Sequence, residues 1–202
     1  MQITILPLQQ LDQAALISMA DLHHQVMRTL LAELGLPIVR RYYQVAQSDS
    51  DSTGMCALDE EGRAVGWAFG STEPARLTRA LQKPLSWFLF EIFKAAFTTP
   101  ISLHDLIGSL LADHSPNQLK PGQIELTYIG VTTAAQGNGL GRLLLDEFCA
   151  AARQKGFSSV ALSVETNNSH AIQLYTRKGF HIICTFHEGR FERHRMEYPL
   201  PA

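Results

Sequence analysis

The feature that most constrains this chain is a glycine-rich turn between a predicted strand and a predicted helix. The strand candidate is residues 124–131, the helix candidate is residues 140–155, and Gly137, Gly139 and Gly141 lie at their junction. A helix start carries about four backbone N–H groups without intrahelical partners, and the helix dipole makes that end positive. Glycines allow an anion to approach the backbone closely. The segment therefore predicts an α/β fold with an anion site, most often for phosphate, at the helix start.

The residues of this turn narrow the choice of phosphate ligand. A dinucleotide-binding Gly-x-Gly-x-x-Gly pattern that starts at Gly137 would need a glycine where Arg142 stands. The Gly-Lys-Ser/Thr of a nucleotide-binding P-loop is absent. The pattern that fits is Gln-x-x-Gly-x-Gly, formed by Gln136, Gly139 and Gly141. These six residues alone leave two interpretations open, a phosphate site or a tight strand-to-helix turn.

A second motif follows about 30 residues later, in residues 167–180. It fits the pattern Asn-x-x-Ala-x-x-Leu-Tyr-x-x-x-Gly-Phe through Asn168, Ala171, Leu174, Tyr175, Gly179 and Phe180. An asparagine or serine caps the start of a short helix. Gly179 ends the helix in the left-handed conformation, and Phe180 begins the next strand.

In this order and spacing, the two segments resemble the two motifs of the GCN5-related N-acetyltransferase (GNAT) family. The resemblance is sharp from Ile124 to Phe180 and looser from Met1 to Gly70, and it does not explain residues 71–122. It implies an α/β (α+β) fold with a mixed, mostly antiparallel central sheet flanked by helices. It also implies a splayed strand pair at an acetyl-CoA site. We expect one domain, residues 1–202, with a helical insertion at about residues 71–122.

The resemblance implies an enzyme that transfers the acetyl group of acetyl-CoA directly to a primary amine. Asn138 stands where the family often has a basic residue, so Arg142 is expected to supply part of the positive charge. The residues placed at the acetyl-CoA site are Ile129, Val131, Gln136, Gly137, Asn138, Gly139, Gly141, Arg142, Asn168 and Tyr175.

Tyr175 and Glu125 are the two residues to which the resemblance gives catalytic roles. Tyr175 matches the tyrosine near the CoA sulfur, which can protonate the leaving thiolate if its pKa, ordinarily about 10, approaches the thiol's, or if the two share the proton. A backbone N–H near Val131 is expected to meet the thioester oxygen. Glu125 is the candidate base for the amine, with a water chain as the alternative. Without a catalytic role it would be a glutamate at a strand start, either solvated or salt-bridged.

The remaining elements are predicted from periodicity and turn residues. Helices are expected over residues 11–46, with an interruption near residues 34–37, and over residues 85–97, where apolar side chains recur on several faces. We expect the latter helix to be buried in the core, in a dimer contact or over a substrate pocket. The predicted strands are residues 2–6, the hairpin 55–58 and 64–70, residues 160–164, and the final pair 180–186 and 194–200.

Composition argues against several classes of partner. The formal net charge is -2, without blocks of like charge, so we expect no nucleic acid and no membrane partner. Cys56, Cys149 and Cys184 are far apart and odd in number, which predicts three buried thiols rather than disulfides or a structural zinc site. The adjacent His23 and His24 suit no common metal geometry, and no metal is expected. No signal peptide is recognised, so the predicted location is the cytoplasm.

The sequence leaves the acceptor open. An enclosed pocket walled by residues 71–122 would favour a small-molecule amine, and a protein N-terminus or lysine is the alternative. Two other classes remain, a non-catalytic acyl-CoA-binding scaffold of the same fold and an enzyme for another phosphate ligand. The Trp87–Phe90 run leaves a homodimer open.

Overall fold

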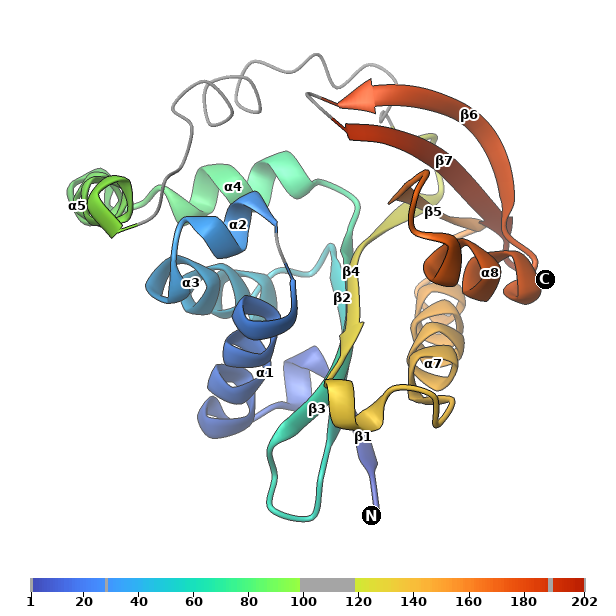
Figure 1. Cartoon of the computed structure of the whole chain (residues 1–202), viewed down its shortest axis with the longest axis horizontal. Coiled ribbons are helices and arrows are strands. Elements are labelled where there is room, and N and C mark those ends of the chain that lie inside the picture. Colours follow the sequence, from blue (N-terminus) through green and yellow to red (C-terminus); the bar gives the residue numbers. More distant parts are fainter. Residues whose placement is uncertain (1, 28, 99–118, 189–190, 202) are drawn as a thin grey trace. The chain divides into compact units, whose positions relative to one another are not determined.

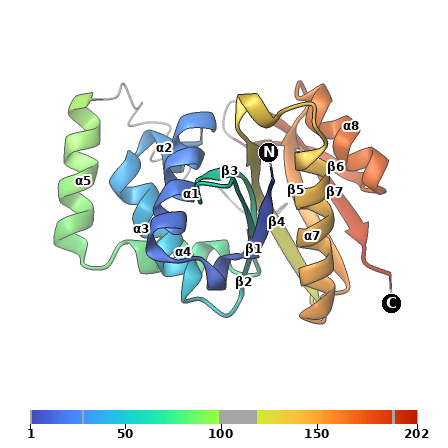
Figure 2. The ribbon, with the colours of Figure 1, turned by 90° about the horizontal axis from the view of Figure 1, so that it is seen from below.

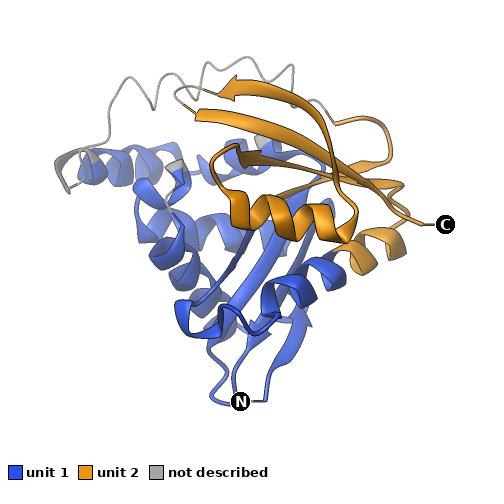
Figure 3. Cartoon of the chain, turned by 45° about the vertical axis from the view of Figure 1, so that its right-hand side comes forward, with its two compact units in different colours: residues 1–101, 128–148 blue, residues 102–127, 149–202 orange. Residues whose placement is uncertain are grey.

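The computed structural model describes residues 2–27, 29–98, 119–188 and 191–201 (Figure 1). The chain forms two compact units (Figure 3). Unit 1 comprises residues 1–101 and 128–148, and unit 2 comprises residues 102–127 and 149–202. The strand β4 and the helix α7 each contribute residues to both units. Whether the chain is one domain, as the sequence predicts, stays a prediction.

Unit 1 contains an antiparallel meander of three strands and the end of a fourth. Its strands are β1 (Thr4–Pro7), β2 (Ser52–Leu58), β3 (Ala64–Ser71) and the last residues of β4 (Gln123–Val131). The β2–β3 hairpin turns at Gly62, whose φ of 77° suits glycine, and the Asp59 carboxylate accepts the backbone N–H groups of Glu61 and Arg63. Every residue of β2 and β3 is buried, so side chains cover both faces of these strands.

The helices of unit 1 lie on both sides of this meander (Figure 2). Asp12 caps the first of them by accepting the backbone N–H of Ala15 at 2.8 Å. Gly35 and Pro37 mark the start of a later helix, at the interruption that the sequence predicts near residues 34–37. The helical segments are η1 (Leu8–Gln10), α1 (Gln13–Val26), α2 (Leu30–Glu33), α3 (Leu36–Gln47), α4 (Pro74–Leu81), α5 (Leu85–Thr98), η3 (Thr133–Ala135) and the first part of α7 (Leu140–Gln154).

The helix α5 exists as predicted, but burial in the core, one of the three environments expected for it, is wrong. Leu85, Leu89 and Phe90 are more than half exposed, whereas Glu91 and Ala95 are buried. Both sides of the helix carry large apolar residues, so periodicity alone could not indicate which side packs inward. Lys94 forms an ion pair with Glu91 at 2.8 Å. The homodimer stays a prediction, and the part of the 71–122 insertion at residues 99–118 lies outside the described residues.

The sheet of unit 2 has one polar face and one apolar face. Its strands are the first residues of β4 with β5 (Ser159–Glu165), β6 (His181–Glu188) and β7 (Phe191–Pro199). The helix α8 (Ser169–Lys178) packs on the apolar face, because the Lys178 ammonium lies 5.6 Å from the Tyr198 ring and Phe180 stacks on the same ring. The β5–β7 register pairs Leu162 with Met196 on this face and places Ser163 opposite Arg195 on the polar one.

The strand order β1-β2-β3-β4-β5-β7-β6 confirms the predicted mixed, mostly antiparallel sheet flanked by helices. The β4–β5 pair is parallel, and its register covers three residue pairs, from Gln123–Ser159 to Glu125–Ala161. Beyond these pairs β5 continues to pair with β7 up to Glu165. The splayed strand pair that the resemblance implies stays a prediction.

Two details of the sequence interpretation need correction. Cys56 and Cys149 are buried thiols, but Cys184 is exposed, because it lies on β6, an edge strand of the sheet. The predicted helix at residues 11–46 is interrupted a second time, between Val26 and Leu30. The final two strands start or end within a few residues of their predicted limits, with β7 beginning three residues earlier, at Phe191.

Candidate functional site

The glycine turn in unit 1 has the backbone that an anion site requires. Gly137 and Gly139 both have φ of 79°, in the left-handed region that favours glycine. A side-chain carbon added at either position would meet no atom within 4 Å, so the glycines serve backbone conformation and leave open space above the turn. The Leu143 N–H donates to the Gly139 carbonyl at 3.0 Å, which sets the beginning of α7. The N–H groups of the residues between them lack intrahelical acceptors at this helix start.

Side-chain charge adds little to this turn. Gln136 and Asn138 are exposed, and neither carries a charge. Arg142 has 79% of its side chain exposed and lies 3.8 Å from the Asp146 carboxylate, one helical turn further on. Such an exposed pair is weak, so Arg142 remains able to move toward an anion. The backbone N–H groups and the helix dipole are therefore the main features of unit 1 that would attract a phosphate.

The end of β4 leads into this turn and is tightly packed. The Thr132 N–H donates to the Val65 carbonyl at 2.9 Å, which ties the residue after the strand to β3. A side-chain carbon added at Gly66 would lie 2.9 Å from Val131 Cγ1. Glycine at position 66 is thus what lets β4 approach β3 here. Ile129 and Val131, the predicted cosubstrate residues of β4, are both partly exposed.

The burial of His23 in unit 1 was not predicted from the sequence. His23 is fully buried, and its ring stacks on Trp67 with centroids 5.4 Å apart. Its Nδ1 lies 2.7 Å from the Tyr43 hydroxyl, and its Nε2 lies 3.1 Å from Thr29 Oγ1. Burial, with a smaller contribution from the charge of His24, lowers the pKa of His23 to about 4, so the ring is neutral near pH 7. The helical position gave no signal for this network, since its partners come from three other segments.

Asn168 and Tyr175 lie on α8 in unit 2. The Asn168 side chain accepts the Ala171 N–H at 3.1 Å, which confirms its capping role. Gly179, with φ of 108°, ends the helix as the motif predicts. Tyr175 is buried, its ring centroid lies 5.7 Å from that of Phe180, and burial raises the pKa of its phenol. The raised pKa widens the gap to a thiol, so sharing a proton with a thiolate is favoured over complete transfer.

Glu125, the predicted base, forms a buried ion pair in unit 2. Arg195 Nη1 donates to its carboxylate at 2.6 Å and to Ser163 Oγ at 3.1 Å. Desolvation raises the pKa of Glu125, and the positive charge of Arg195 opposes that increase. The salt-bridged interpretation of this glutamate is therefore the one that the structure bears out. Its role as a base stays a prediction.

The polar face around this ion pair has buried atoms without hydrogen-bond partners. In the described part of the chain these include Thr127 Oγ1, Arg193 Nε and Arg195 Nη2. Strand periodicity places Thr127 on the same face as Glu125, and Arg193 on the same face as Arg195. Arg193 Nη1 is paired with Glu188 at 2.6 Å. Buried polar atoms in folded proteins are normally satisfied, so a buried water or a shift of these side chains would be needed to satisfy these three.

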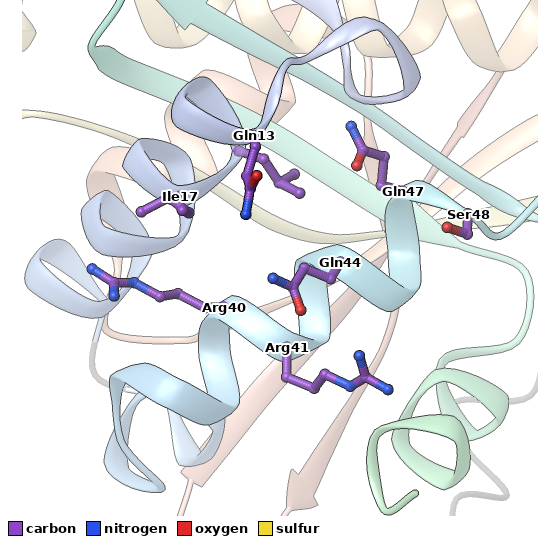
Figure 4. A pocket seen from close by; sticks show the side chains of 8 residues that line it. Gln13, Ile17, Arg40, Arg41, Gln44, Gln47 and Ser48 are labelled. Carbon is purple, nitrogen blue, oxygen red and sulfur yellow. The ribbon is translucent and has the colours of Figure 1, made fainter.

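A groove of about 430 Å³ lies between α1 and α3 in unit 1 (Figure 4). Arg40 extends along its edge and binds Asp21 through two hydrogen bonds of 2.7 and 2.8 Å, which neutralise its charge. Arg41 points away from Arg40. None of the residues predicted for the acetyl-CoA site line this groove, whose walls are Gln13, Leu16, Ile17, Arg40, Arg41, Gln44, Gln47 and Ser48.

The predicted site residues are thus divided between the two units. Those of the turn and the end of β4 belong to unit 1, and Glu125, Asn168 and Tyr175 belong to unit 2. Within the described ranges, no three histidine, cysteine or carboxylate side chains are grouped as a metal ion would require. The same part of the chain contains no helix with the length and apolar character to span a membrane.

Comparison with known proteins points to one family. A model described as the acetyltransferase (GNAT) family matches residues 23–180. A mycothiol acetyltransferase of Jonesia denitrificans is 30% identical over 168 residues, which are 81% of this chain and 48% of the relative. A mycothiol acetyltransferase of Mycobacteroides abscessus is 29% identical over 174 residues, 78% of this chain and 58% of the relative. The chain thus spans about half the length of these relatives.

Solved structures agree on the fold. The Arabidopsis thaliana NAA60 complex with acetyl-CoA has a TM-score of 0.61 and 14% identity, covering 98% of this chain and 99% of that one. The ribosomal-protein-S18-alanine N-acetyltransferase of Escherichia coli has a TM-score of 0.59 and 15% identity, covering 100% of this chain and 96% of that one. At these identities the likeness concerns the fold alone.

Proposed function

Because the chain belongs to the acetyltransferase (GNAT) family, we propose that it transfers the acetyl group of acetyl-CoA directly to a primary amine of a small molecule. Membership makes it an acetyl-CoA-dependent acyltransferase. The observation that carries the proposal is the turn at Gly137 and Gly139, with left-handed backbone and open space where a pyrophosphate would lie. Gln136, Asn138, Gly141 and Arg142 complete this binding segment.

The reaction needs a nucleophilic amine, a stabilised thioester oxygen and a partner for the departing thiolate. The neutral amine attacks the thioester carbon, and its nitrogen–carbon bond forms as the carbon–sulfur bond breaks. We assign the thioester oxygen to the N–H of Val131, with Ile129 beside the pantetheine arm. Tyr175 donates a hydrogen bond to the thiolate, and its raised pKa keeps the phenol protonated until that charge develops.

The proton lost by the amine has two candidate acceptors. Glu125 has a raised pKa, which suits a base, but its carboxylate already accepts a hydrogen bond from Arg195. Glu125 would accept the proton of the amine through its other carboxylate oxygen or through a bound water. A water chain to solvent is the alternative. Besides capping α8, Asn168 would donate a hydrogen bond to CoA.

The names of the relatives favour a small acceptor. The two relatives that match 81% and 78% of this chain are called mycothiol acetyltransferase, at 30% and 29% identity. The alternatives are a protein N-terminus or lysine, and a non-catalytic acyl-CoA-binding scaffold of the same fold. A cytoplasmic location stays a prediction.

The test is calorimetric binding of acetyl-CoA to the wild type and to Gly139→Trp. Two lost hydrogen bonds to a charged phosphate, at about 1.5 kcal/mol each, predict about a hundredfold weaker binding. Gly62→Trp is the matched control, because Gly62 has nearly the same φ of 77° and equally open space but lies in the β2–β3 turn. Equal losses in both variants would remove the turn from the site.

Catalysis is then tested by release of free thiol from acetyl-CoA with a panel of small amines, peptides with free N-termini and lysine peptides. Turnover of small amines supports the proposal. Turnover of peptides alone would identify the protein-acetylating alternative. Tight acetyl-CoA binding without turnover of any acceptor would support the scaffold.

A further inference from the structure

The position of Gly130, one residue before the end of β4, is explained by its neighbour Trp67. Gly130 is not among the glycines with positive φ, so its backbone conformation does not require glycine. A side-chain carbon there would instead lie 2.8 Å from Cη2 and from Cζ3 of the Trp67 indole. Real side chains do not approach so closely, so the indole occupies the space that any other residue at position 130 would need.

Trp67 is itself held by hydrogen bonds and stacking. Its Nε1–H donates to the Tyr43 hydroxyl oxygen at 2.9 Å, and that hydroxyl lies 2.7 Å from His23 Nδ1. The His23 ring stacks on the indole, and all three side chains are fully buried. The indole therefore cannot retreat from Gly130 without breaking a buried hydrogen bond.

The other face of the same strand end is fixed as well. A side-chain carbon at Gly66 would lie 2.9 Å from Val131 Cγ1 and 3.2 Å from the Gly130 carbonyl oxygen. Residues 130 and 131 therefore lie against Trp67 on one face and against the glycine backbone of β3 on the other. The hydrogen bond from Thr132 N–H to Val65 fixes the next residue along the chain.

We propose that Trp67 is a positioning residue, which holds Gly130 so that the Val131 N–H points at the thioester oxygen of acetyl-CoA. The inference rests on the proposed function. Trp67 touches neither the cosubstrate nor the acceptor in this scheme and acts through the backbone of Gly130. A displacement of about 1 Å at a reacting group can cost about a hundredfold in rate, so fixing this strand end matters.

The test compares the affinities for acetyl-CoA and for CoA, measured by calorimetry in Trp67→Phe, Gly130→Ala and the double variant. CoA lacks the thioester oxygen, so only the ratio of the two affinities reports the Val131 contact. Each single variant should lower the ratio about tenfold, the loss of one hydrogen bond. Trp67→Phe leaves space over Gly130, and Gly130→Ala fills it. The double variant should therefore recover most of the ratio.

Leu8→Ala is the control for stability, because Leu8 is buried against Gly54 on β2, a strand not adjacent to β4. It should lower the melting temperature and leave the ratio unchanged. A wild-type ratio in Trp67→Phe, or a double variant no better than the single ones, would overturn the inference while acetyl-CoA binding still supported the proposed function. A wild type that binds neither ligand would refute the proposed function, and the inference with it. If Gly130→Ala does not fold, Trp67→Phe alone decides.

Discussion

The buried polar groups of the two units differ in charge and in their response to pH. In unit 1, His23 is neutral and lies among Tyr43, Trp67 and Tyr128, whose ring centroid is 4.6 Å from its own. In unit 2, Glu125 and Arg195 form an ion pair with 16% and 6% of their side chains exposed. The His23 network buries no charge, whereas in the Glu125–Arg195 pair each buried charge is compensated by the other.

The two networks should respond to pH in opposite directions. The folded state lowers the pKa of His23, so its contribution to stability is present above the unfolded pKa and is lost as the pH falls. The folded state raises the pKa of Glu125, so its contribution is present at low pH and is lost as the pH rises past the unfolded value. Burial thus makes the Glu125 carboxylate easier to protonate in the folded protein than in the unfolded chain. A histidine kept neutral by deep burial serves to orient its neighbours.

The largest predicted effect is the loss of stability that follows when Arg195 is removed from the ion pair. Arg195→Met leaves Glu125 buried without its cation, and the free energy of unfolding should fall by about 3–5 kcal/mol. Urea unfolding at pH 7 measures this loss. Because the pKa of Glu125 should rise further without Arg195, the variant should regain stability as the pH is lowered.

The matched control is the double variant Glu125→Leu with Arg195→Met. Apolar replacement of both partners of a buried pair is often neutral or stabilising. The double variant should therefore be clearly more stable than Arg195→Met alone. If the single and the double variant lose equal stability, the loss comes from packing rather than from an uncompensated charge. The difference in buried charge between this pair and His23 would then not matter for stability.

A smaller effect is predicted for His23, and only in acid. The difference between its ordinary pKa of 6.5 and about 4 in the folded protein corresponds to a loss on the order of 3 kcal/mol as the pH falls through that range. The free energy of unfolding of the wild type, measured from pH 7 to pH 4, should fall more steeply than that of His23→Gln. Carboxylates that titrate in the same range cancel in this difference. Parallel curves would show that His23 is not held neutral.

The sequence predicted the local features of unit 2 better than the buried contacts of either unit. The end of α8 at Gly179, the cap at Asn168 and the end of α7 before Gly156 each depend on residues a few positions apart. These features follow from backbone conformation and from hydrogen bonds within one turn, which a motif can specify.

The buried contacts depend on strand register and packing instead. Arg195 and Glu125 are 70 positions apart in the chain, and their pairing needs β4, β5 and β7 in the observed register. The contact between His23 and Trp67 likewise joins a helix to a strand. No periodicity in the sequence indicates either, so the motif identified Glu125 but not the arginine that restrains it.

The smallest predicted effect concerns Asn168, a polar contact exposed to water that serves as the reference for both buried networks. Asn168→Ala removes the cap of α8 and should cost about 1 kcal/mol in unfolding free energy, with little dependence on pH. Asn168→Asp keeps an oxygen to accept the Ala171 N–H, so the stability should be retained. Calorimetry with acetyl-CoA separates the two roles of the residue. If Asn168 only caps the helix, the aspartate variant binds acetyl-CoA as the wild type does. If its amide also donates a hydrogen bond to CoA, the aspartate variant binds more weakly although its helix is intact.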